Sequence, residues 1–183
     1  MRHNLALRED LLGPVETYYN GNYLDSRLDA RWALFFDSLG LGFRYTRAAD
    51  NQGGGSMFYM TALDTWLVTR PALPEPHDSA GIQRWVRDGS ATTAAILFGL
   101  CWYPWERDSY GGWLWFRNAA REDGWQRDVV WRQCVRCGVR CLASAAEPCA
   151  ECGRRRSLSL DTPRLVRSYE SAASMSFTNR GRV

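Results

Sequence analysis

The sequence contains no lysine, because all 23 of its basic residues are arginine. This absence excludes Schiff-base chemistry on a lysine, a Walker-A phosphate loop and any nuclease centre that requires a lysine. Histidine is scarce as well: His3 is near the start of the sequence, and His77 is in a proline-rich segment. A serine or cysteine nucleophile activated by histidine is therefore not expected.

A long apolar run is also absent. The longest stretch without charge, residues 89–105, is shorter than the roughly 20 apolar residues of a membrane-spanning helix, and Ser90 and Pro104 interrupt it. Glu9 and Asp10 occupy the positions where a signal peptide would have its apolar core. We therefore predict a cytoplasmic protein with no membrane partner.

What the chain does have is enough apolar material for one core and an uneven charge. Of its 183 residues, 45% are hydrophobic, which excludes a mainly disordered chain. Residues 1–125 carry 12 arginines and 15 acidic residues, whereas residues 126–183 carry 11 arginines and five acidic residues. The basic C-terminal part suits a polyanionic partner, with solubility as the alternative explanation.

The clearest predicted element is a helix over residues 26–39. Ser26 is a suitable N-cap, Asp29 completes a capping box, and Gly40 is a suitable C-cap. Apolar side chains recur at helical spacing and form one face, made of Leu28, Trp32, Phe35, Phe36 and Leu39. We expect this face to lie against the core.

The remaining pattern predicts an α/β fold. The expected strands cover residues 42–46, 57–63, 66–69 and 92–100, of which the second and third form one bent strand or a hairpin. Further helices are expected over residues 81–89 and from residue 161. A helix before a buried strand suggests a parallel crossover, and so a small mixed sheet with flanking helices. The tryptophan-rich stretch 102–131 is interpreted as core, with base stacking as the alternative.

Four cysteines form the strongest chemical pattern. They have the spacing C-x2-C-x11-C-x2-C and are Cys134, Cys137, Cys149 and Cys152. Such pairs bring four thiolates to one tetrahedral zinc ion, and a glycine follows each pair, where a metal knuckle needs positive φ. Four protein ligands leave no open position, so we predict a structural zinc ribbon. The alternatives are disulfides, an iron ion, and Cys141 in place of one ligand.

Arginines surround this cysteine pattern. They are Arg132, Arg136, Arg140, Arg154, Arg155 and Arg156. On a rigid metal-bound ribbon they would form a phosphate-binding face, and the alternative is an ordinary solvated surface.

The helix and both ends of the chain resemble a known family. Residues 26–40 read SRLDARWALFFDSLG, and residues 18–21 and 164–177 add to the likeness. They resemble uncharacterised phage and actinobacterial proteins whose helix typically reads SRLEARWAVFFDALG. The resemblance implies a restriction-endonuclease-like domain of the PD-(D/E)XK type. In such a domain, carboxylates hold Mg²⁺ or Mn²⁺, which activates water for phosphodiester hydrolysis.

The resemblance assigns candidate catalytic residues that match the family pattern only in part. Asp29 stands where the family helix has glutamate, and Asp64 aligns with the aspartate of the PD motif across a two-residue gap. Arg70 stands in place of the lysine, and Val68 stands in place of the second-strand glutamate. Valine cannot bind a metal ion, so we expect a degenerate site.

Together these patterns predict three parts. Residues 1–125 form the nuclease-like α/β domain, residues 126–158 the zinc ribbon, and residues 159–183 a helix and tail. The expected function is nucleic-acid association without catalysis, in phage or mobile-element biology. One alternative is an active Mg²⁺- or Mn²⁺-dependent nuclease that uses Asp29 and Asp64. Another is a structural or protein-interaction module of a larger assembly.

Overall fold

The structure is a computed structural model that describes six segments of the chain. They are residues 15–47, 56–71, 93–99, 110–118, 121–143 and 147–177, and the backbone alone is described for residues 110–118 and 121–128. The helix expected over residues 81–89 lies outside these segments. No helix within them is long and apolar enough to cross a membrane.

Helix α2 (Arg27–Leu39) begins and ends as its sequence predicts. The Ser26 hydroxyl accepts a hydrogen bond from the Asp29 N–H at 3.0 Å. Gly40 ends the helix with φ of 69°, and its N–H donates to the Asp37 carbonyl at 2.8 Å. The N–H of Leu41 donates to the Phe36 carbonyl at 2.9 Å, which completes a glycine-terminated cap.

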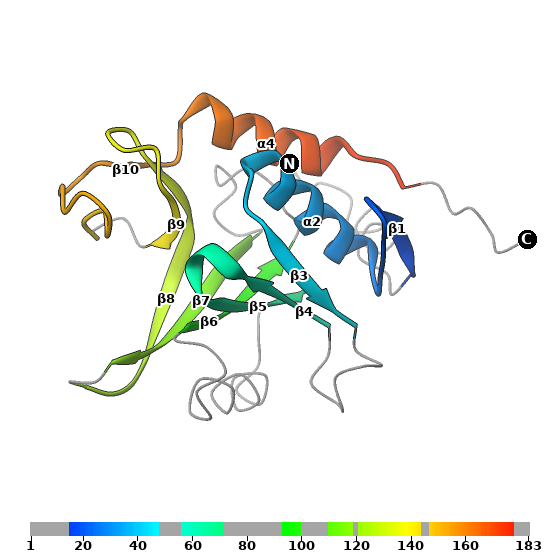
Figure 1. The fold of residues 1–183 in the computed structure, drawn as a ribbon, viewed down its shortest axis with the longest axis horizontal. Helices are drawn as coiled ribbons and strands as arrows, with labels where there is room; N and C mark the ends of the chain where they lie inside the picture. Colours follow the sequence, from blue (N-terminus) through cyan, green and yellow to red (C-terminus); the bar gives the residue numbers. More distant parts are fainter. Residues whose placement is uncertain are drawn as a thin grey trace, which may run out of the picture.

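An eight-stranded mixed sheet forms the largest element of the described residues (Figure 1). Its strands are β3 (Phe43–Thr46), β4 (Met57–Met60), β5 (Thr65–Arg70), β6 (Thr93–Gly99), β7 (Tyr110–Asn118), β8 (Arg121–Cys134), β9 (Arg140–Ala143) and β10 (Leu158–Ser159). The order is β10-β8-β7-β6-β5-β4-β3, and β9 also pairs with β8. Only the β5–β6 pair is parallel among the described pairs, which confirms a mixed sheet.

Two short elements complete the chain's strand pattern. The hairpin β1 (Thr17–Tyr19) and β2 (Asn22–Leu24) precedes α2 and pairs only with itself in the described part of the chain. The 3₁₀ turn η2 (Thr61–Leu63) joins β4 to β5, which pair antiparallel. Residues 57–70 therefore form a hairpin rather than one bent strand.

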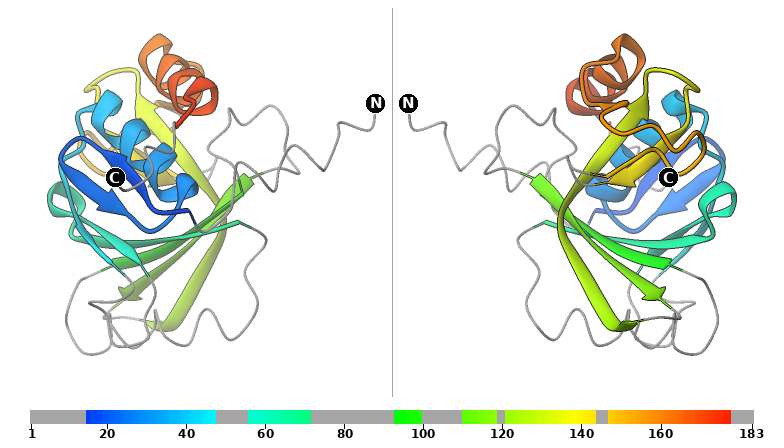
Figure 2. Two further views of the ribbon diagram at one scale, coloured as in Figure 1. Left: turned by 90° about the vertical axis from the view of Figure 1, so that its right-hand side faces the viewer. Right: turned by 90° about the vertical axis from the view of Figure 1, so that its left-hand side faces the viewer.

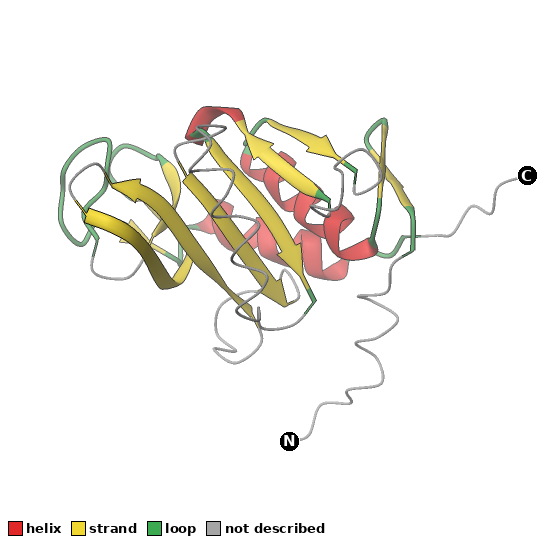
Figure 3. Ribbon diagram, turned by 90° about the horizontal axis from the view of Figure 1, so that it is seen from below, coloured by secondary structure: helices red, strands yellow, loops and turns green. Residues whose placement is uncertain are grey.

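Both helices lie on the same face of the sheet (Figure 3). Helix α4 (Pro163–Ser174) packs against α2, which lies between α4 and the sheet (Figure 2). Because α2 is covered on two sides, nine of its 13 residues are buried. Its aromatic side chains form the centre of the core with Phe58 of β4, Trp131 of β8 and Tyr169 of α4.

Strand β8 connects this core with the cysteines. The Trp131 ring lies 5.6 Å from the Phe36 ring and 6.0 Å from the Phe35 ring, centroid to centroid. Trp131 is thus core, as the sequence predicts for the tryptophan-rich stretch. Three residues later, the strand ends at Cys134. The strand also crosses residue 125, so no linker separates the predicted first two parts.

Candidate metal centre

The four cysteine sulfurs converge on one point. The ligand atoms of Cys134, Cys137, Cys149 and Cys152 all lie within 4.8 Å of one another. The Sγ atoms of Cys134 and Cys152 are 3.7 Å apart, and those of Cys137 and Cys149 are 3.6 Å apart. Metal–sulfur bonds of about 2.3 Å in a tetrahedron place sulfurs about 3.8 Å apart. The spacing therefore fits one tetrahedral metal ion.

The same distances decide between the alternatives for the cysteines. A disulfide needs sulfurs about 2.05 Å apart, and the four cysteines are free. Cys141 lies on β9, is half-buried, and is outside the four-sulfur group. It does not replace a ligand.

The two C-x-x-C turns have the same backbone geometry. The N–H of Gly138 donates to the Cys134 carbonyl at 2.9 Å, and the N–H of Gly153 donates to the Cys149 carbonyl at 2.8 Å. Both glycines have positive φ, 76° and 65°. The N–H of each first cysteine donates five residues ahead, to Val139 at 2.8 Å and to Arg154 at 3.1 Å. We call these turns the first and second knuckles (residues 134–138 and 149–153).

Electrostatics favours a cation between the sulfurs. Hydrogen bonding to Ser157 and to the Cys137 backbone lowers the pKa of Cys134 to about 5. The pKa of Cys137 rises to about 12: the N–H of Val139 lowers it, but desolvation and the three neighbouring thiols together raise it more. Without a cation, the four thiols do not all ionise near neutral pH. A bound divalent ion offsets their repulsion, so the donor set suits a thiophilic metal.

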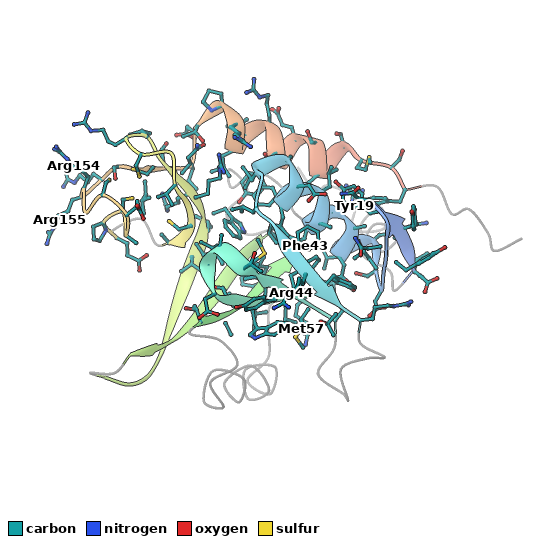
Figure 4. All side chains as sticks on the ribbon, viewed as in Figure 1. Tyr19, Phe43, Arg44, Met57, Arg154 and Arg155 are labelled. Carbon is teal, nitrogen blue, oxygen red and sulfur yellow. The ribbon has the colours of Figure 1, made fainter. Side chains whose placement is uncertain are left out.

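Four of the six predicted phosphate-binding arginines are exposed. Arg136 lies in the first knuckle, and Arg154, Arg155 and Arg156 directly follow the second. The side chains of Arg154 and Arg155 point away from the molecule at the end where the knuckles lie (Figure 4). These four guanidiniums are available to an external anion.

The other two arginines are half-buried on strands. Arg132 on β8 donates through Nε to the Ala143 carbonyl at 3.2 Å and so supports the β8–β9 pair. The pKa of Arg140 on β9 is lowered by burial and by the charge of Arg164. The structure therefore divides the predicted set into four exposed arginines and two that belong to the sheet.

Asp29 lies in the core between α2 and the sheet. Its side chain is buried, and its carboxylate accepts hydrogen bonds from the hydroxyls of Thr69, Tyr45 and Ser56, the latter two at 3.0 and 3.1 Å. Burial raises the pKa of Asp29, and these hydroxyls with that of Ser26 oppose the rise. The carboxylate ties α2 to β3, β4 and β5.

Asp64 is not brought to Asp29. Asp64 accepts a hydrogen bond from the Tyr59 hydroxyl at 2.7 Å and precedes the first residue of β5, whereas Asp29 contacts Thr69 near the strand's other end. Thr65 and Thr69 are about 13 Å apart at about 3.3 Å per residue. Two ligands of one Mg²⁺ or Mn²⁺ ion must lie far closer than this. Among the described residues, the four cysteines are the one metal-ligating group.

The third candidate, Arg70, ends β5 and is half-buried. Its guanidinium donates to the carbonyl of the preceding residue, Thr69, at 3.0 Å. Val68, at the position of the family's glutamate, is buried in a second apolar cluster with Met57, Ala94 and Ile96. An apolar environment here fits a sheet position without a metal ligand.

Sequence reasoning missed two sets of residues around these sites. Ser157 contacts both Cys134 and Arg154, and no motif marks it. The hydroxyl partners of Asp29 come from three separate segments, so only the fold brings them together. Comparisons with protein-family models, curated proteins and solved structures find no match for this chain.

Proposed function

We propose that the protein binds nucleic acid through a zinc-stabilised module that carries an exposed arginine surface. The observation that supports this most directly is the position of Arg136, Arg154, Arg155 and Arg156, all exposed and all on or beside the two knuckles. Guanidiniums form bidentate hydrogen bonds with phosphate oxygens, and a rigid scaffold reduces the entropy lost when they bind.

The charge of the module agrees with a polyanionic ligand. Residues 129–160 contain six arginines against Glu147 and Glu151 as their acidic residues. A divalent ion held by four thiolates adds a net charge of −2, and the segment remains positive. Phosphate contacts of this kind position a protein on nucleic acid without reading its sequence.

Zinc is the metal that we propose for the centre. Four sulfurs in a closed tetrahedral set are typical of structural zinc, and the matched knuckles supply them. The residues fit the ion, which would join two knuckles that the described residues connect mainly by backbone hydrogen bonds. Metal analysis of the purified protein is expected to give about one zinc per chain. An iron–sulfur absorption spectrum in its place would assign iron.

We further propose that the α/β domain is a nuclease-like scaffold without catalytic activity, with a role in phage or mobile-element biology. The resemblance of residues 26–40 supports the relationship, and the separation of Asp29 from Asp64 supports the loss of activity. End-labelled single- and double-stranded DNA should stay intact with Mn²⁺. Cleavage that Asp64→Ala abolishes would contradict this proposal.

The binding proposal has a charge-matched test. Arg154→Gln/Arg155→Gln removes two exposed charges from the module, and Arg44→Gln/Arg167→Gln removes two exposed charges elsewhere. The first variant should bind DNA about tenfold more weakly at low salt, with the salt dependence reduced by about 0.9 per lost phosphate contact. The second variant should bind like wild type.

Two outcomes would count against the binding proposal. No binding of DNA or RNA by the metal-loaded protein at low salt would overturn it. Equal losses in the two double variants would mean that net charge, not the module, attracts nucleic acid. Copurification of one protein at fixed stoichiometry, without nucleic acid, would favour a protein-interaction module.

A further inference from the structure

The turn that carries the arginines is attached to both knuckles. We call residues 154–157 the arginine turn. At one end, the Arg154 carbonyl accepts from the Cys149 N–H at 3.1 Å, which is a contact with the second knuckle. At the other end, the Ser157 carbonyl accepts from the Val135 N–H at 2.9 Å, which is a contact with the first knuckle. The turn therefore bridges two segments that a metal ion would also join.

The backbone of the arginine turn is held in a conformation that arginine rarely adopts. Arg156 has φ of 58°, in the left-handed region. A residue with a Cβ stays there only when its surroundings hold it. The two carbonyl contacts with the knuckles provide this restraint. If the knuckles separate, the turn loses it.

Ser157 makes the direct contact between the sulfur cluster and the turn. Its side chain is buried, its Oγ lies 3.3 Å from Cys134 Sγ, and its hydroxyl donates to the Arg154 carbonyl at 2.9 Å. On metal binding, Cys134 loses its proton to solvent and becomes an acceptor. The Ser157 proton is then able to turn to the thiolate, since the Arg154 carbonyl keeps its bond from Cys149.

We propose that Ser157 is a positioning residue that couples the metal centre to the arginine turn, so that the turn binds phosphate groups only when the metal is bound. This inference rests on the proposed nucleic-acid function and adds its regulation. The Ser157 hydroxyl orients the Cys134 thiolate, and its carbonyl fixes the turn to the first knuckle. Removal of the metal releases Arg154, Arg155 and Arg156 from their common surface.

The first experiment compares the full chain loaded with zinc and the same chain stripped by a chelator, both kept reduced. Binding of a fluorescent oligonucleotide should weaken at least about tenfold on stripping and return when zinc is added back. Tryptophan fluorescence follows whether the α/β core stays folded. Unchanged affinity after stripping would overturn the inference and leave the proposed function intact. No binding by the zinc-loaded chain would overturn the proposed function itself.

The second experiment isolates the hydroxyl. Ser157→Ala keeps the backbone carbonyl and all four ligands, and Ser174→Ala is the control because its hydroxyl contacts only the Ser171 carbonyl on α4. Groups that hydrogen-bond metal ligands typically account for 10- to 100-fold in metal affinity. Ser157→Ala should therefore need about tenfold more Co²⁺ for half-saturation, and the sulfur-to-cobalt absorption band should shift.

The DNA-binding curve of Ser157→Ala should follow its metal titration and reach half-maximum at the same raised metal concentration. Ser174→Ala should match wild type in both readouts. A purely structural loss at Ser157 would lower the amount of folded protein without moving the absorption band. A wild-type band and a wild-type metal titration for Ser157→Ala would overturn the coupling role.

Discussion

The Arg31 guanidinium on α2 caps the C-terminal end of α4, 141 residues away, by donating hydrogen bonds to the carbonyls of Ala172 and Ala173, the latter at 2.7 Å. The side chain is buried, and its guanidinium also lies 5.8 Å from the centre of the Phe177 ring. A cation at a helix C-terminus satisfies carbonyls that the helix leaves open and opposes its dipole. This contact joins the two helices that cover the sheet.

Loss of the Arg31 cap should destabilise the whole fold. Arg31→Met keeps an unbranched apolar stem but leaves the carbonyls at the end of α4 without their charged donor, so we expect a loss of about 2–4 kcal/mol. Urea unfolding followed by tryptophan fluorescence measures it. The matched change on the exposed face of α4, Arg167→Met, should alter the free energy of unfolding by less than about 0.5 kcal/mol. Similar losses in both variants would contradict the capping role.

The cysteine assignment has a control in the same module. Cys149→Ser removes a ligand and should abolish stoichiometric metal binding, whereas Cys141→Ser changes a half-buried thiol outside the sulfur group and should retain it. Metal content after gel filtration separates the two. Full metal retention by Cys149→Ser would mean that the ligands are different.

Asp29 should make stability depend on pH with a defined sign. Because burial raises its pKa above the ordinary 3.8, the native state holds this proton more tightly than the unfolded chain does. Its contribution to stability is therefore largest at low pH and falls as pH rises from about 4 through the raised pKa.

Asp29→Asn removes this titration and keeps a group that can pair with hydroxyls. The variant should be at least as stable as wild type near pH 7, and wild type should gain on it as pH falls toward 4. Asp29→Ala leaves the hydroxyls of Thr69, Tyr45 and Ser56 unpaired and should lose about 2–4 kcal/mol at either pH. Chemical unfolding of the three proteins at both pH values checks this. An Asn variant less stable than wild type by more than about 1 kcal/mol near pH 7 would show that the charge stabilises the fold.

Two neighbouring glycines should respond differently to alanine. Gly40 has φ of 69°, and a Cβ there would lie 3.1 Å from the Arg164 guanidinium, so Gly40→Ala should cost about 1–2 kcal/mol. A Cβ at Gly42 would meet only the Thr61 hydroxyl at 3.9 Å, and Gly42→Ala should change stability by less than about 0.5 kcal/mol. Thermal unfolding gives the order. Equal effects would mean that the left-handed cap is not needed.

Local signals in the sequence were sufficient where a few adjacent residues define the geometry. Ser26 and Gly40 bound α2 as expected, since caps act within one turn. The cysteine spacing identified the four sulfurs that converge, because each pair needs only a short turn. The strand over residues 92–100 was recognisable by its continuous apolar run and corresponds to β6.

Contacts between distant segments were not predictable in this way. The long hairpin β7–β8 was not predicted, since glycines and clustered aromatics in residues 110–134 obscure the alternation of a half-buried strand. The capping-box assignment for Asp29 describes its N–H correctly, but its carboxylate pairs with Thr69 on β5. Arg31 shows no sequence signal at all, because its partners are carbonyls of another helix.

The short path along β8 from Trp131 to Cys134 makes the chain one cooperative unit rather than a domain with a detachable finger. Trp131 packs on α2 at one point of the strand, and three residues later the same strand supplies a metal ligand. Strain or fraying at the ligand is therefore transmitted to the aromatic centre of the core within about 10 Å. The affinity of the centre for its metal and the melting temperature of the whole protein become two measures of the same folding equilibrium.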